Sequence, residues 1–220
     1  DNKLEDRIIF EEIPSGQTWL TCIADAMRRN RVLSITHQGF GKPEPSTFEI
    51  EPYCLKVVKR RWYVVARSPY YSERNKEKGI KPVDVYRVYA LDRISDIQDT
   101  GKTFKMKKDF DVNQYFEGCC GVITSDEPIQ RIVLLAYGGF ADYLRTLPLY
   151  ESQREIEGDD ESTLFEYHLK PTFDFYQLVL AQGDQVEVLE PESVRNEMRN
   201  FAKNMLDYYT WKEEDKPCKE

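Results

Sequence analysis

The sequence predicts an α+β protein of two domains: a small β-barrel that follows a helix, and then a second mixed domain that ends in a helix. Short runs rich in β-branched and aromatic residues succeed one another between residues 32 and 91. After residue 130, strand-like and helix-like runs alternate instead. A segment with glycine, proline and acidic residues separates the two patterns, as is typical of a linker.

Composition narrows the class of protein further. The chain has 220 residues, of which 40% are hydrophobic, so it can build one large core or two ordinary ones. It holds no apolar run near 18 residues, which argues against a membrane span. Its five cysteines form no CxxC pair and it has two histidines, so we expect no disulfide framework, no metal and no cofactor. A reducing cytoplasm fits this cysteine usage best.

The first half is expected to contain one helix and five short strands. The helix covers residues 17–29, with Thr18 able to cap its start and Asn30 suited to its end. Residues 68–84 are polar and rich in turn-forming residues, so they are predicted to be a long exposed loop. The predicted strands are 32–36, 47–51, 53–58, 62–66 and 85–91. This order favours a small barrel.

The second half predicts the order βαββαβ, which is the split arrangement of ferredoxin-like domains. A final helix opens at Pro191, and its apolar stripe runs from Val194 to Tyr209. The elements ahead of it are a strand at 131–137, a helix at 140–147, a hairpin of 150–157 with 163–169, a helix at 172–182 and a strand at 185–190. The expected segments are a linker and leading helix (1–30), the barrel (31–117), a linker (118–129), the second domain (130–210) and a frayed tail (211–220).

Charge is divided unevenly along the chain. Residues 28–108 hold 19 Lys and Arg against 9 Asp and Glu, whereas residues 109–220 hold 10 against 24. A basic segment in an acidic chain indicates an anionic partner for that segment. Chance clustering, with attraction between two domains of opposite charge, is the alternative explanation.

No catalytic motif of hydrolases, metalloproteases or P-loop enzymes is present, so we expect no catalytic residues and no enzyme. Arg87 alternates with apolar residues in its strand, and a buried guanidinium needs a carboxylate or a bound anion. Asp92 is one carboxylate that could serve. His37 shares a strand face with Leu33 and Ile35.

The stretch "KRRWYVVARS" divides by its period of two. Trp62, Val64 and Ala66 are expected to face inward, while Tyr63 and Arg67 share the opposite face. Residues 59–61 are expected to form a hairpin turn whose cations add to the positive electrostatic field of the basic segment. Cations and rings at strand ends resemble single-stranded nucleic-acid binders. The full set of expected ligand-binding residues is Arg87, Arg93, Arg67, Tyr63, His37, Ser34 and Tyr89.

Two separated motifs, "EPYCLKVVKRRWYVVARS" and "VYRVYALDRI", resemble the WYL domain, and "LTCIADAMRRNRVLSITHQ" ahead of them resembles its leading helix. The second half, with "RIVLLAYGGFADYLRTLPLYESQ" and "LVLAQGDQVEVLEPESVRNEMRNFAKNMLDYY", is similar to the WCX extension that follows many WYL domains. The chain departs from the family pattern at Val64, where Leu is usual, and at His37, Ala90 and Tyr150, where Tyr, Arg and His are usual.

The resemblance implies an Sm-like or SH3-like barrel that senses a nucleic-acid-type ligand, with Arg87 and Arg93 as its strongest ligand candidates. It also implies a bacterial transcription regulator that forms a homodimer and reaches duplex DNA through a missing N-terminal helix-turn-helix. The expected partner is single-stranded nucleic acid or a nucleotide-like anion, and no membrane. The alternative is a stand-alone single-stranded RNA- or DNA-binding accessory protein. A hydrolase acting on nucleic acid or nucleotides is a third alternative.

Overall fold

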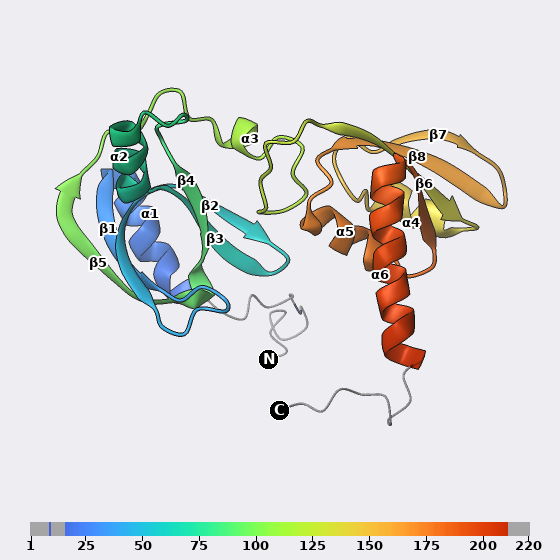
Figure 1. Cartoon of the computed structure of the whole chain (residues 1–220), viewed down its shortest axis with the longest axis horizontal. Helices are drawn as coiled ribbons and strands as arrows, with labels where there is room; N and C mark the ends of the chain where they lie inside the picture. The colour runs from blue at the N-terminus through green and yellow to red at the C-terminus, as the bar shows by residue number, and fades with distance from the viewer. Residues whose placement is uncertain (1–8, 10–15, 211–220) are drawn as a thin grey trace, which may run out of the picture. The chain divides into compact units, whose positions relative to one another are not determined.

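A bent five-stranded antiparallel sheet with helix α1 (Leu20–Arg29) packed against it forms the first half of the chain (Figure 1). The computed structural model describes Ile9 and residues 16–210; the predicted tail and most of the N-terminal linker lie outside these residues. Two units result, Asp1–Val112 and Asn113–Glu220. Among the described helices, none combines the length and the apolar character that crossing a membrane requires.

Helix α1 is close to its prediction. The short turn η2 (Gln17–Trp19) precedes it, and no side chain caps its start, so the cap expected from Thr18 is wrong. Asn30 ends the helix as predicted, in the left-handed conformation (φ 52°), and its N–H bonds the carbonyls of Ala26 and Met27. Ile23 and Ala26 are buried against the sheet.

The sheet of the first unit has the strand order β4-β3-β2-β1-β5. Its strands are β1 (Arg31–His37), β2 (Ser46–Val58), β3 (Arg61–Arg67), β4 (Tyr86–Ala90) and β5 (Ile94–Thr103). Strand β2 joins two predicted strands, and a register shift between Pro52 and Cys54 lies in its pairing with β3, shortly after the pairing with β1 ends at Ile50. Proline has no N–H to give to a ladder, so a bulge is where it fits, and the bulge bends the sheet.

The described strands of the predicted barrel do not close into a ring, because β4 and β5 each pair on one side alone. The turn η3 (Leu91–Arg93) interrupts the chain between them, and its Leu91 is fully buried in the core of the unit. Strand β5 was not expected from the sequence, since charged and polar residues occupy most of it. The inward-facing predictions for Val64 and Ala66 are confirmed, and Trp62 packs against the same core.

The predicted loop 68–84 contains helix α2 (Pro69–Lys78), so that prediction is wrong for most of its length. Ser68 caps the helix by accepting a hydrogen bond from the Tyr71 N–H, and Pro69 occupies the first turn, where its missing N–H costs nothing. Gly79 ends the helix at φ 64°. These start and stop signals outweigh the polar composition.

The second unit follows the predicted order βαββαβ, after the short helix α3 (Val112–Tyr115). Its elements are β6 (Gln130–Tyr137), α4 (Phe140–Thr146), β7 (Arg154–Gly158), β8 (Ser162–Leu169), α5 (Phe173–Leu180), β9 (Val186–Glu190) and α6 (Glu192–Thr210). The sheet order is β7-β8-β6-β9, and every pair is antiparallel. Along the expected stripe of α6, Val194 is buried, but Leu206 and Tyr209 are exposed.

The segment 118–123, which was predicted to belong to a linker, is bonded to the second unit. The Asp174 carboxylate, at the start of α5, accepts hydrogen bonds from the N–H groups of Val122 and Ile123, both at 2.9 Å. The N–H of Lys170 donates to the carbonyl of Gly118 at 2.7 Å. This segment is therefore held in a fixed path.

Candidate functional site

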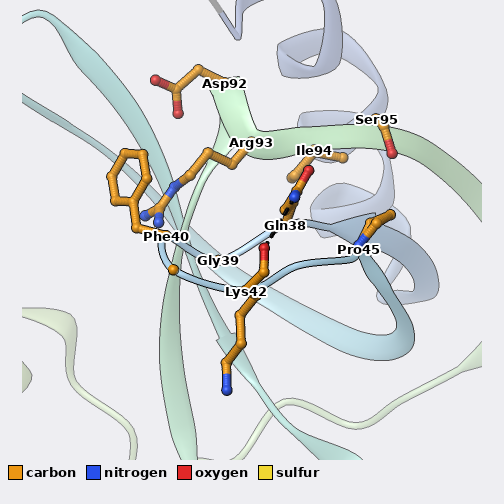
Figure 2. Close-up of a pocket in the computed structure, with 10 residues that line it drawn as sticks. Gln38, Gly39, Phe40, Lys42, Pro45, Asp92, Arg93, Ile94 and Ser95 are labelled. Atoms are coloured by element: carbon orange, nitrogen blue, oxygen red, sulfur yellow. Dashed lines mark hydrogen bonds between the residues drawn. The ribbon is translucent and has the colours of Figure 1, made fainter. Parts of the chain in front are cut away.

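A pocket of about 490 Å³ opens in the first unit, where the loop after β1 meets η3 and the start of β5 (Figure 2). The loop carries Phe40 and Lys42, and the opposite wall carries Asp92 and Arg93. The N–H of Gln38 donates to the carbonyl of Arg93 at 3.0 Å, which ties the two walls together. The pocket is thus built from segments that are far apart in the sequence.

Arg93 reaches across this pocket and lies over the Phe40 ring, with its Cζ 4.1 Å from the ring centroid (Figure 2). Phe40 is 75% exposed, so one face of an apolar ring is left open to solvent. Within the described residues, the Nε of Arg93 is buried without a hydrogen-bond partner, and no carboxylate forms an ion pair with this side chain. A cation held in this way can bind an anion without first breaking an ion pair.

His37 lies at the end of β1, in an aromatic cluster with Tyr89 and Phe48. Its ring centroid is 5.4 Å from that of Tyr89 and 6.5 Å from that of Phe48. Burial lowers the pKa of His37, and the positive charge of Arg93 lowers it further, while Asp92 acts in the opposite direction. Its Nε2 is buried and finds no hydrogen-bond partner in the part of the chain that the structure describes. The imidazole is therefore neutral at pH 7 and has an unused polar atom.

Asp92 pairs with Arg61, whose Nε lies 2.8 Å from one carboxylate oxygen, and not with Arg87 as the sequence suggested. The other oxygen of Asp92 has no partner among the described residues. Arg61 begins β3 instead of belonging to the hairpin turn, which consists of Lys59 and Arg60 alone. Asp92 thus pairs with the first residue of β3, and Arg87 of β4 makes a different contact.

Arg87 is exposed, which corrects the expectation that its guanidinium is buried between apolar neighbours. It sits near the start of the edge strand β4, where helix α2 follows the neighbouring strand β3. Its guanidinium lies over the Tyr71 ring, 4.0 Å from the centroid. Because water solvates the cation, no buried carboxylate is needed there.

The other three predicted site residues lie apart from the pocket. Arg67 bonds Glu51 at 3.1 Å and Asp84 at 2.5 Å, so its charge is already compensated. Ser34 lies on the face of β1 opposite to His37, and Tyr63 is half-buried on β3 beside Ala90 of β4. The structure therefore brings together His37, Tyr89 and Arg93, places Arg87 beside α2, and does not gather Ser34, Tyr63 and Arg67 with them.

Sequence reasoning missed Phe40 and Tyr71 as site residues. Phe40 stands between two glycines, and an exposed aromatic residue in such a turn was the available signal. Tyr71 was missed with its helix, although Ser68 and Pro69 marked the start of that helix. Within the described residues, no group of three His, Cys, Asp or Glu side chains could hold a metal ion.

Comparison with known proteins adds two matches in order along the chain. The model of the WYL domain matches residues 18–99, which include the pocket, and that of the WCX domain matches residues 128–206. No curated protein matches the chain.

Two solved structures are similar over most of this chain. One is proteasome accessory factor B/C (PafBC) of Arthrobacter aurescens, with 21% identity and a TM-score of 0.34 over 90% of this chain. The other is a CRISPR Cas-related protein, with 12% identity and a TM-score of 0.48 over 86% of this chain. The present chain spans 28% of the first and 50% of the second.

Proposed function

We propose, since this chain is a WYL domain protein with a WCX domain after the WYL domain, that it is the ligand-sensing part of a bacterial transcription regulator. The proposed effector is a single-stranded nucleic acid or a similar anion, which binds at the pocket of the first unit. The signal would pass through a homodimer to an N-terminal helix-turn-helix that contacts duplex DNA in the cytoplasm. The protein would act by binding, without catalysis.

The observation that carries this proposal is the position of Arg93 against Phe40. A guanidinium that has no ion pair with any described residue, held on an exposed ring, would provide a phosphate contact and a stacking surface at one point. His37, paired with Ile94 of the pocket wall, would add a positive charge close to a bound phosphate once it is protonated. The excess of Lys and Arg in residues 28–108 would draw a polyanion toward this unit.

The position of the pocket suggests how binding could be transmitted. Its walls join the loop after β1 to η3, and η3 is the connection between the two edge strands β4 and β5. A ligand that holds these walls together would favour one arrangement of the sheet edges over another. That difference in affinity between two arrangements is what a regulator needs.

The proposal extends to the finer fold classes. The order β4-β3-β2-β1-β5 after an N-terminal helix supports an open Sm-like sheet for the first unit. The order β7-β8-β6-β9, with β8 antiparallel to both β6 and β7, supports the ferredoxin-like class for the second.

Titration with labelled oligonucleotides tests the proposed function. A single-stranded oligonucleotide of mixed sequence should bind at low salt, more tightly than the same sequence as a duplex. Its affinity should fall linearly with salt concentration on logarithmic axes. Failure to bind at about 20 mM salt, or equal affinity for both forms, would contradict the proposal.

A further inference from the structure

Helix α2 is fixed against the start of β4 by two buried serines. The N–H of Ser68 donates to the carbonyl of Val85 at 2.8 Å. The N–H of Val85 in turn donates to the hydroxyl oxygen of Ser72 at 3.0 Å. Ser68 and Ser72 are 3% and 1% exposed, so these bonds are shielded from water. The first turn of α2 and the strand that carries Arg87 therefore form one rigid piece.

This attachment brings an aromatic ring under a cation. Tyr71, in the first turn of α2, is half-buried, and the Arg87 guanidinium lies 4.0 Å from its ring centroid. Arg74, one turn further along, lies 5.8 Å from the same ring. Tyr70 contacts Tyr71 edge to face at 5.1 Å, and its own ring is 67% exposed.

The arrangement leaves Arg87 with one planar face free. Tyr71 covers one face of the guanidinium, the residue as a whole is exposed, and the described residues offer it no ion pair. A guanidinium plane stacks well on a nucleobase, and the tyrosine beneath it restricts its rotation. Because the stack is formed in advance, binding loses less side-chain entropy than it would at a flexible arginine.

The chemistry of this surface differs from that of a simple anion site. A cation alone binds any polyanion, whereas a planar guanidinium stacked on a ring also gains affinity for a ligand that carries a planar group. The bases of a duplex are covered on both faces by their neighbours, so only an unstacked base could lie on Arg87. The neighbouring Arg74 can meet the phosphate that accompanies such a base.

We propose that the Tyr71–Arg87 stack is a binding position for one unstacked nucleobase of the ligand. The proposal rests on the proposed function and makes it more specific. It adds helix α2 to the binding surface, outside the pocket that Phe40 and Arg93 form.

The variant Arg87→Lys tests this, because it keeps the charge and removes the plane. Its affinity is measured for two oligonucleotides of equal length and charge, one with bases throughout and one with abasic sites in a central tract. Wild-type protein should bind the first about tenfold more tightly. Arg87→Lys should lose a measurable part of that preference, because Phe40 still offers a stacking surface, and should bind the abasic form as wild type does. Arg28→Lys, at an exposed arginine of α1, is the matched control.

Tyr71→Leu is the second variant, since it keeps apolar bulk under Arg87 without an aromatic face. It should reduce the same preference, and thermal unfolding of each variant shows whether the fold is retained. Equal wild-type affinity for both oligonucleotides would overturn the proposed nucleobase position and leave the proposed function standing. A preference unchanged in both folded variants would overturn it as well. If neither oligonucleotide binds at low salt, the proposed function itself fails.

Discussion

The Cζ of Arg93 lies 4.1 Å from the ring centroid of Phe40, and this contact joins the two walls of the pocket. The ring holds the guanidinium in place and leaves its positive charge uncompensated, whereas a carboxylate would neutralise that charge. The charge of Arg67, at the end of β3, is compensated, because its guanidinium pairs with Glu51 and Asp84. This difference makes Arg93, and not Arg67, the candidate for contact with an anion.

His37 should make ligand binding depend on pH. Burial and Arg93 lower its pKa below the usual value near 6.5, so the free protein holds it neutral at pH 7. A phosphate in the pocket would raise that pKa, and binding would then take up a proton. Affinity for a single-stranded oligonucleotide should therefore increase as pH falls from about 8 to about 5.5. Fluorescence anisotropy at constant ionic strength measures this.

The chain provides a matched control for that experiment. It has two histidines, and His168 is exposed on β8 of the second unit. His37→Gln should remove most of the pH dependence, whereas His168→Gln should leave it intact. The same pH dependence in His37→Gln and in wild type would show that another group takes up the proton.

Asp92 should weaken the affinity of the pocket for anions. It is the carboxylate of the pocket wall, and it also holds Arg61 at 2.8 Å. Asp92→Asn removes a negative charge and releases a cation, so oligonucleotide affinity should rise roughly threefold to tenfold at low salt. The free energy of unfolding should fall by at most about 1 kcal/mol, because the pair is partly exposed.

Asp142→Asn is the comparison, since it breaks an exposed ion pair with Arg145 in the second unit and changes the net charge equally. It should alter affinity by less than about twofold. A similar gain in both variants would mean that net charge, and not the pocket, decides binding.

The hairpin between β2 and β3 should be stabilised by residues that suit its turn. Lys59 and Arg60 both have positive φ, at 47° and 62°, where Asn-Gly is the preferred pair. Lys59→Asn together with Arg60→Gly should raise the free energy of unfolding by about 1 kcal/mol, as read from urea denaturation. Arg60→Ala keeps a Cβ and should bring no gain. Equal stability of the double variant and wild type would contradict this account of the turn.

Much of the fold follows from local patterns, and the exceptions have physical causes. Strands such as β3 and β6 are apolar with clear ends, so their periodicity predicts them well. Strand β5 is mostly polar and exposed, and its pairing with β1 is a long-range contact that no local pattern announces. Helix α2 was not predicted because its polar composition was given more weight than the start signal of Ser68 and Pro69.

Single residues of the candidate site could be predicted from the sequence, but their proximity could not. Arg93 and His37 were named from the sequence, but their proximity depends on the register that places His37 opposite Ile94. Phe40 lies in a loop, where periodicity gives no information about neighbours. Arg67 looked like a ligand residue because its carboxylate partners, 16 and 17 positions away, cannot be recognised from spacing alone.

The most direct test of the account compares Arg93→Ala with Arg28→Ala. Both remove one positive charge from the first unit, but Arg28 lies exposed on α1, paired with Asp25 and outside the pocket. The affinity of each for a single-stranded oligonucleotide is measured across a series of salt concentrations. Arg93→Ala should bind about tenfold more weakly at low salt, and the slope of its salt dependence should fall by nearly one ion. Arg28→Ala should change affinity by less than about twofold. If the two variants lose the same affinity, the pocket at Arg93 is not where the ligand binds.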